Sequence, residues 1–347
     1  KNPLGYHIHS LFWHLFAVCS LWVILFRKRE HFGFSEIEVL LATALFGLHP
    51  FCSEVVFWIS ARNDSMCLSL SLWSLFFFWR EKPNWLLGGL FFLGALLCKE
   101  TAIVLIPAVL FLESKYRQKI ILILVGVFLL WFVLRRMVLT DVELLVLHSE
   151  HLSQIPIVFI DQLARFWIPL NLSPAQAITW LSIPWWKWLL GGLTLYWLGR
   201  SFWMEPKMRF WIIFGAGAMI VTIPQMAHVG MFGDRYWIYA LPMWGIQLSR
   251  KLNWKMLSPL LLGWMIMVWN QGDFWKDDYN FWENQYRQTP NSFTAVSFAH
   301  ISYEKSNLNQ AYKLYQEGYS VSSPYLYGCD NFLTLALKLE GAEKVIQ

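Results

Sequence analysis

Long apolar runs follow one another along the first 270 residues, separated by short polar or charged segments. Because a helix needs about 20 apolar residues to cross a bilayer, these runs predict about nine or ten membrane-spanning helices. Some runs hold only about 15 residues, and such helices would need tilt or a thinner bilayer. We therefore expect an all-α, polytopic transmembrane bundle, with spans at residues 8–26, 37–58, 65–79, 84–98, 101–113, 119–134, 181–199, 208–224, 235–249 and 256–270.

The stretch from about 137 to 180 interrupts this pattern, because it is less apolar and richer in Pro, Asp, Glu and His. We interpret it as an outer loop on the membrane surface that contains amphipathic pieces such as Ile157–Leu170. Arg135 and Arg136 would then lie at the outer end of a span, against the positive-inside rule.

After Asn270 the chain becomes polar and contains no further apolar run. Pro290 recurs as Pro324 and Asn307 as Gly341, each at a spacing of 34 residues, which is typical of the tetratricopeptide repeat (TPR) with its two antiparallel helices. Two partial repeats cannot bury a continuous core, so the array either continues beyond Gln347 or docks on the membrane domain. We predict a membrane domain at 1–270 and a TPR-like segment at 271–347 on the non-cytoplasmic side.

Composition supports a membrane protein, because 56% of the residues are hydrophobic and only 15% are charged, against about a quarter charged in soluble domains. The 22 Trp and 27 Phe fit the aromatic belts of membrane interfaces. The five Cys show no zinc-ligand spacing, which excludes a disulfide framework or a metal finger. The net charge of +5 comes mostly from short clusters between apolar runs, so we expect no nucleic-acid partner.

The basic clusters also predict the orientation of the helices, because Lys and Arg accumulate in cytoplasmic loops. We expect residues 27–29, 80–82, 115–119 and 250–251 on the cytoplasmic side. Counting crossings from these clusters places Arg62, Lys99 and Arg235 together on the outer side. Cations on the side opposite the cytoplasmic clusters are not explained by the positive-inside rule, and they suit a membrane-embedded phosphate site.

Each of these cations also has a simpler interpretation as an interfacial ion pair with a nearby carboxylate. The neighbouring residues that belong to the candidate site on either interpretation are Asp64, Glu100, Asp234 and Tyr236. A carboxylate such as Glu100 at the start of a helix is stabilised by the helix dipole, which favours the structural interpretation there.

Two further polar residues lie in an apolar run. Pro50 breaks or kinks its helix, and His49 could hydrogen-bond the carbonyls that are freed. Glu54 needs a partner at that depth. His49, Glu54 and Asp64 are therefore candidates to support catalysis.

The histidines near the start of the chain do not predict a metal site. His7 and His14 lie two helical turns apart and His9 lies between them, but no carboxylate or Cys completes a ligand set. The chain also lacks P-loop, GxSxG and HExxH motifs, so nucleotide-driven and hydrolase functions have no support.

An ordered set of motifs resembles the transmembrane-and-TPR (TMTC) proteins and their bacterial relatives over about 270 residues. The segments that carry the resemblance are Asn2-Pro3-Leu4-Gly5-Tyr6-His7 with His14, His49-Pro50 with Glu54 and Ser60-Ala61-Arg62-Asn63-Asp64, Lys99-Glu100-Thr101, Pro169-Leu170-Asn171-Leu172-Ser173, and Arg235-Tyr236 with Tyr239 and Pro242.

The resemblance implies a GT-C membrane glycosyltransferase, which moves a sugar from a polyprenyl-phosphate carrier to a protein Ser or Thr hydroxyl on the non-cytoplasmic side. The polyprenyl-phosphate-linked sugar would be the donor, and the TPR segment would bind the acceptor protein. Arg62, Lys99 and Arg235 would bind the lipid phosphate and stabilise the charge that develops on it. A divalent cation has no support from the residues.

Family members carry a further N-terminal span and a first outer loop whose acidic residue is the catalytic base. The chain begins with Lys1, just after the place where that loop would end. We therefore expect N-terminal truncation, with the catalytic acid upstream of Lys1.

Four positions depart from the family pattern and leave room for altered specificity or an inactive enzyme. Cys52 replaces the second His of HPxH, Ser10 the Asn after GYH, Ala61 a Gly and Ala175 an Asp. The alternative function is a non-catalytic membrane scaffold whose TPR segment binds partner proteins. A transporter is disfavoured, because the intramembrane charges do not fall in paired half-helices. We expect a multi-pass protein of a bacterial inner membrane with the TPR segment in the periplasm, although an endoplasmic-reticulum membrane also fits.

Overall fold

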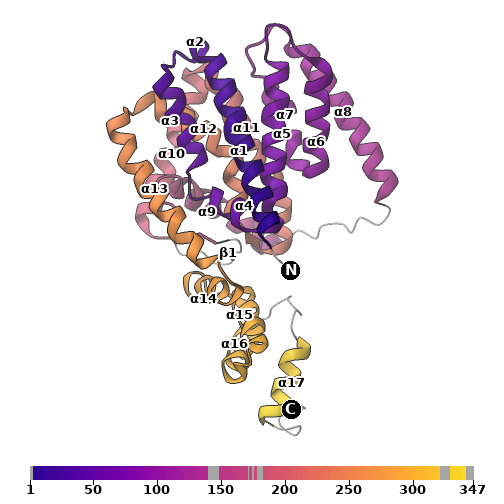
Figure 1. The fold of residues 1–347 in the computed structure, drawn as a ribbon, viewed down its shortest axis with the longest axis vertical. Helices are drawn as coiled ribbons and strands as arrows, with labels where there is room; N and C mark the ends of the chain where they lie inside the picture. Colours follow the sequence, from indigo (N-terminus) through magenta and orange to yellow (C-terminus); the bar gives the residue numbers. More distant parts are fainter. Residues whose placement is uncertain are drawn as a thin grey trace. The chain divides into compact units, whose positions relative to one another are not determined.

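The computed structural model describes residues 3–139, 148–170, 172–173, 176–177, 183–320 and 329–340. Part of the predicted loop at 137–180, including Asn171 and Ala175, lies outside the described residues, as do the recurring Pro324 and Gly341. The described chain consists of helices joined by short turns, and this confirms the predicted all-α fold (Figure 1). Two segments of two residues have strand geometry, β1 (Gln176–Ala177) and β2 (Met231–Phe232).

The chain divides into two compact units. Unit 1 comprises Lys1–Leu172 and Ile178–Trp269, and unit 2 comprises Ser173–Ala177 and Asn270–Gln347.

Unit 1 is a helical bundle with a large apolar core. Its α-helices are α1 (Leu4–Arg27), α2 (Arg29–Phe32), α3 (Glu36–Gly47), α4 (Cys52–Phe57), α5 (Arg62–Phe78), α6 (Trp85–Cys98), α7 (Leu105–Val109), α8 (Arg117–Val138), α9 (Ser149–Arg165), α10 (Trp185–Met204), α11 (Pro206–Val229), α12 (Leu241–Lys251) and α13 (Trp254–Phe274), which runs on into unit 2. Three short 3₁₀ helices complete it: η1 (Ile59–Ala61), η2 (Glu100–Val104) and η3 (Asp234–Ala240).

Three described helices are long and apolar enough to cross a membrane, by length and composition. They are Leu4–Arg27, Arg117–Val138 and Pro206–His228. The apolar helices Trp85–Cys98 and Glu100–Val109 are shorter. The three long helices indicate that the protein associates with a membrane.

Helices α1 and α5 pack side by side and run in the same direction (Figure 1). Where both helices begin, the Arg62 guanidinium lies 5.3 Å from the centre of the Tyr6 ring. Where both end, the Arg27 guanidinium lies 5.0 Å from the centre of the Phe76 ring. At about 1.5 Å per residue, α5 separates these two ends by about 25 Å.

The predicted span at 37–58 is two helices with a break between them. Ser35 and Glu38 form a capping box that starts α3, and α3 ends before His49 and Pro50. Pro50 has no N–H to continue a helical ladder, so the chain turns here before α4 begins. The charged residues Arg62 and Asp64, which follow, therefore lie in the first turn of a new helix, α5, and not in the middle of one long helix.

Helix α9 occupies part of the predicted outer loop and is packed into unit 1, against α10 and α11. It covers only part of the predicted amphipathic piece at 157–170. Its last turn is buried, including the charged residues Asp161 and Arg165, which are 2% and 1% exposed. The described part of this loop thus contributes to the core of the bundle.

Unit 2 contains α14 (Asp278–Gln288), α15 (Ser292–Glu304), α16 (Leu308–Ser320) and α17 (Cys329–Glu340). A three-residue turn joins α15 to α16, with Ser306 at φ 63°, so the two form the helical hairpin that the first predicted repeat requires. Tyr286 of α14 donates a hydrogen bond of 2.6 Å to Glu317 of α16. Burial and this carboxylate raise the pKa of Tyr286 to about 12.

Candidate functional site

A cavity of about 280 Å³ lies where α5 begins, α6 ends and η3 begins. Five of the residues predicted for the site line it, namely Asp64, Lys99, Glu100, Arg235 and Tyr236. The other lining residues are Trp58, Ser60, Ala61, Asn63, Cys98 and Gln225. The fold therefore brings together two of the three predicted outer cations, although they are far apart in the sequence.

Lys99 enters the cavity because α6 stops directly before it. Its backbone is extended, at φ −162° and ψ 140°, and η2 begins at the next residue. The Nζ atom lies 2.5 Å from Oδ1 of Asp64 in the first turn of α5 and 4.6 Å from the centre of the Tyr236 ring. The ammonium group thus combines a buried ion pair with a cation–π contact.

Arg235, the second residue of η3, is held on several sides. Its side chain forms an ion pair with Glu54 of α4, and its backbone N–H donates to the same carboxylate at 2.8 Å. The guanidinium lies 4.7 Å from the centre of the Trp58 ring and 4.6 Å from that of Tyr236. Its Nε is 3.9 Å from Oδ2 of Asp64. Arg235 is therefore the partner that the sequence required for Glu54, a carboxylate within an apolar run.

Asp64 lies between the two cations and is 1% exposed. Its Oδ1 accepts from Lys99, whereas its Oδ2 accepts no hydrogen bond from any described group. The backbone carbonyl of Asp64 accepts a hydrogen bond of 3.3 Å from the Tyr239 hydroxyl, which fixes the first turn of α5 against η3.

Asp234 has a different partner from its neighbour Arg235. Its carboxylate accepts two hydrogen bonds from Arg165 of α9, at 2.7 and 3.2 Å, and both side chains are almost fully buried. Arg165 also donates to the Leu170 carbonyl at 3.0 Å. This bidentate pair fixes η3, and hence Arg235, against α9.

Sequence reasoning missed Arg165. The available signal was a single arginine between apolar residues at the end of an amphipathic pattern, which needs an anionic partner when buried. The pattern did not indicate which carboxylate would supply it.

Arg62 is half-buried, lies over the Tyr6 ring and does not line the cavity. Glu100 lines it but is exposed, and its carboxylate lies 3.9 Å from Arg135 at the end of α8. This pair places Arg135 at the same end of the bundle as Lys99.

His49 is fully buried and does not line the cavity. Its Nδ1 accepts the Phe51 N–H at 3.1 Å, and its Nε2 lies 3.4 Å from the Phe166 carbonyl. The ring also packs edge-on against Trp264, with ring centres 4.5 Å apart. These contacts tie the break after α3 to α9 and α13.

Among the described residues, no group of three or more His, Cys, Asp or Glu side chains could hold a metal ion. Cys19, Cys52, Cys67 and Cys98 are free thiols. The chemistry available at the cavity is therefore that of two cations and two carboxylates beside aromatic rings.

Part of the chain is similar to a known enzyme. An aligned stretch of 107 residues is 35% identical to the protein O-mannosyl-transferase Tmtc1 of Drosophila melanogaster, covering 29% of this chain and 12% of that protein. No family model matches the sequence, and no solved structure matches it significantly. The similarity suggests a glycosyltransferase-like enzyme.

Proposed function

We propose that this protein is a multi-pass membrane glycosyltransferase with a GT-C-like bundle. It would move a sugar from a polyprenyl-phosphate carrier to a protein Ser or Thr hydroxyl on the non-cytoplasmic side. The observation that carries this proposal is the meeting of Lys99 and Arg235 at one cavity, on either side of the buried Asp64. The partial similarity to a protein O-mannosyl-transferase supports the same reaction class.

The two cations suit a phosphate leaving group. Lys99 donates one of its three protons to Asp64, so the ammonium retains donors for a phosphate oxygen. Arg235 adds a guanidinium fixed by Glu54 and by two aromatic rings. Because both groups are in place before the reaction, they stabilise charge that develops on the phosphate without rearranging first.

The carboxylates set the balance of charge at the site. Asp64 and Glu54 neutralise Lys99 and Arg235, so a phosphate must share these cations with them. An anion is then bound weakly enough to be released after transfer. The Oδ2 of Asp64 faces Nε of Arg235 at 3.9 Å, so one carboxylate contacts both cations.

The remaining parts of the proposal follow from the motifs. Arg62 contributes positive charge from the first turn of α5, beside the cavity. The hairpin of α15 and α16 belongs to a TPR-like segment that presents the acceptor protein, in the periplasm if the membrane is a bacterial inner membrane.

The test is sugar transfer by the whole protein that carries this chain, reconstituted in proteoliposomes. Polyprenyl-phosphate-linked mannose labelled in the sugar is the donor probe, and transfer to co-expressed acceptor proteins is measured. We expect Lys99→Ala to reduce transfer about 10- to 150-fold, because a hydrogen bond to a charged group contributes about 1.5–3 kcal/mol.

Lys187→Ala is the matched control. Lys187 forms an equally short, buried pair with Asp161, at 2.5 Å, but does not line the cavity. We expect it to lower stability without selectively removing transfer. Full transfer by a folded Lys99→Ala protein would contradict the assignment. It would favour the scaffold alternative, in which unit 2 binds partner proteins.

A further inference from the structure

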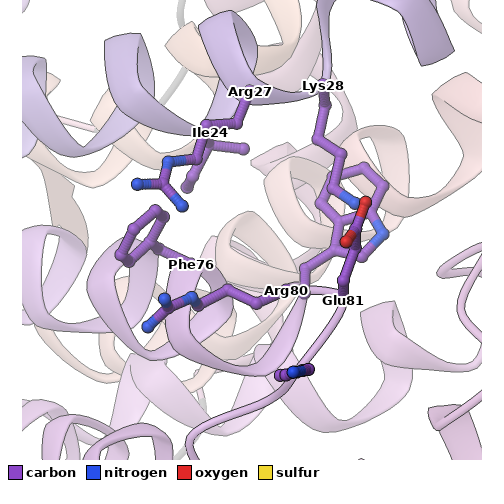
Figure 2. A pocket seen from close by; sticks show the side chains of 8 residues that line it. Ile24, Arg27, Lys28, Phe76, Arg80 and Glu81 are labelled. Atoms are coloured by element: carbon purple, nitrogen blue, oxygen red, sulfur yellow. The ribbon is translucent and has the colours of Figure 1, made fainter.

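A second cavity, of about 400 Å³, lies at the opposite end of α5 from the candidate site. It is formed by the last turns of α1 and α5 and by the turn that follows α5 (Figure 2). Its lining residues are Ile24, Arg27, Lys28, Phe76, Trp79, Arg80, Glu81 and Lys82. Four of these eight residues are cations and one is an anion, so the cavity is strongly basic.

Aromatic rings position three of the cations. The guanidinium groups of Arg27 and Arg80 lie 5.0 and 5.8 Å from the centre of the same Phe76 ring. Figure 2 shows Arg27 and Arg80 on either side of this ring, Arg27 from the last turn of α1 and Arg80 from the turn that follows α5. The ammonium of Lys28 lies 5.0 Å from the centre of the Trp79 ring. The positive groups are therefore gathered at one place and not spread over a face.

Glu81 is the carboxylate that lines this cavity, and it interacts electrostatically with Lys28. No described carboxylate lies within ion-pair distance of Arg27, Arg80 or Lys82. Two guanidinium groups that share one ring repel each other, and an anion between them would relieve this repulsion. A guanidinium binds two phosphate oxygens at once through its planar fork, whereas an ammonium acts as a point charge.

The position of the cavity favours a lipid as the source of that phosphate. Arg27 is the last residue of α1, which is long and apolar enough to cross a membrane. The end of such a helix lies at the level of the lipid headgroups. Ile24, one turn earlier, gives the cavity an apolar wall where the headgroup joins the acyl chains.

We propose that this cavity binds the phosphate of an anionic phospholipid headgroup, on the membrane face opposite the candidate transferase site. The site is independent of the proposed transfer reaction, since it shares no residue with the first cavity. It would hold the ends of α1 and α5 together through a bound lipid.

The test is retention of lipid by the purified full protein, measured by native mass spectrometry during titration with phosphatidylglycerol or phosphatidylcholine. We expect phosphatidylglycerol to bind and phosphatidylcholine not to compete. Arg27→Gln with Arg80→Gln should weaken phosphatidylglycerol binding about 30-fold, which corresponds to about 1 kcal/mol for each cation.

Lys115→Gln with Arg117→Gln is the control, because it removes two positive charges from another predicted cytoplasmic cluster outside the cavity. Less than about threefold weakening is expected for it. Equal weakening by both double variants would overturn the proposal in favour of general membrane attraction. If the protein binds inorganic phosphate but does not retain phosphatidylglycerol, the proposal that the phosphate belongs to a lipid is overturned.

Arg27→Lys with Arg80→Lys keeps the charge, and a loss of binding with normal thermal stability would support recognition by the guanidinium forks.

Discussion

The Nζ of Lys99 lies 2.5 Å from Oδ1 of Asp64, across 35 residues of sequence and between side chains that are 10% and 1% exposed. This ion pair joins the end of α6 to the start of α5 and forms one wall of the candidate site. Because both groups are buried, removing one leaves the other as an uncompensated charge.

Lys99→Met is therefore expected to lower the free energy of unfolding by about 3–5 kcal/mol, since it leaves the Asp64 carboxylate without its hydrogen-bond donor. Asp64→Asn combined with Lys99→Met should recover most of this loss, because both charges of the pair are removed together and Arg235 keeps Glu54 as its partner. Denaturant unfolding of the wild type, both single variants and the double variant in detergent gives the coupling energy. Additive effects of the two substitutions would contradict a stabilising pair.

The same double-mutant cycle on Lys187 and Asp161 separates the effect of a buried ion pair on stability from an effect on sugar transfer. This pair has the same 2.5 Å distance and similar burial, and it joins α10 to α9. We expect comparable coupling energies in both cycles, but only the Lys99 cycle should change sugar transfer.

Arg235→Lys tests the geometry of the second cation. The guanidinium pairs with Glu54, donates to the Tyr236 hydroxyl at 2.9 Å and lies over two rings. The ammonium of a lysine lacks the planar fork of donors that makes these contacts at the same time. We expect transfer to fall at least about tenfold although the charge is kept, which corresponds to the loss of one charge-assisted hydrogen bond. Transfer is measured in proteoliposomes beside the conservative variant Arg62→Lys, which retains charge near the cavity. If Arg235→Lys has wild-type activity, the site requires only positive charge there.

The sequence predicted that Lys99, Arg235 and Arg62 share one end of the bundle, because alternating apolar runs and basic clusters indicate which helix ends lie on the same side. Lys99 and Arg235 do line one cavity, whereas Arg62 lies outside it. Apolar periodicity likewise located most helices to within a few residues. These predictions rest on local composition, which carries enough information to place helix ends.

Partner choice at the site could not be predicted, because it depends on the helix packing angles. Asp234 and Glu54 lie 180 residues apart, and only the fold decides that Glu54 pairs with Arg235 while Asp234 turns to Arg165. The sequence also placed the Trp residues in interfacial belts, but Trp211, Trp237, Trp244 and Trp264 are buried in the core of unit 1. Composition alone cannot distinguish a belt from a packed core.

Arg165→Met tests whether the missed pair positions the site. Its loss leaves Asp234 buried without its bidentate partner, so we expect the free energy of unfolding to fall by about 3–5 kcal/mol. Hydrogen exchange should rise in η3 and α9 more than in α6, because the pair joins those two elements. Arg209→Met is the control, since its guanidinium donates to the carbonyls of Phe202 and Trp203 at the end of α10 and lies over the Phe202 ring. Equal loss of protection in α6 would show a general loss of folding and not local positioning.

Gly245 of α12 marks a close approach of α12 to α3. A Cβ at this position would lie 2.4 Å from the backbone oxygen of Ala42 in α3, and a backbone atom cannot move aside as a flexible side chain can. We expect Gly245→Ala to force α12 away from α3 and to lower the free energy of unfolding by about 1–3 kcal/mol, as overpacking does elsewhere.

Gly263→Ala in α13 is the matched control, because nothing lies within 4 Å of its added Cβ. There the substitution should be neutral or stabilise by up to about 1 kcal/mol through its helix propensity. Both variants are compared by thermal unfolding in the same detergent. Equal stability of the two would mean that α12 and α3 do not meet at Gly245 and Ala42.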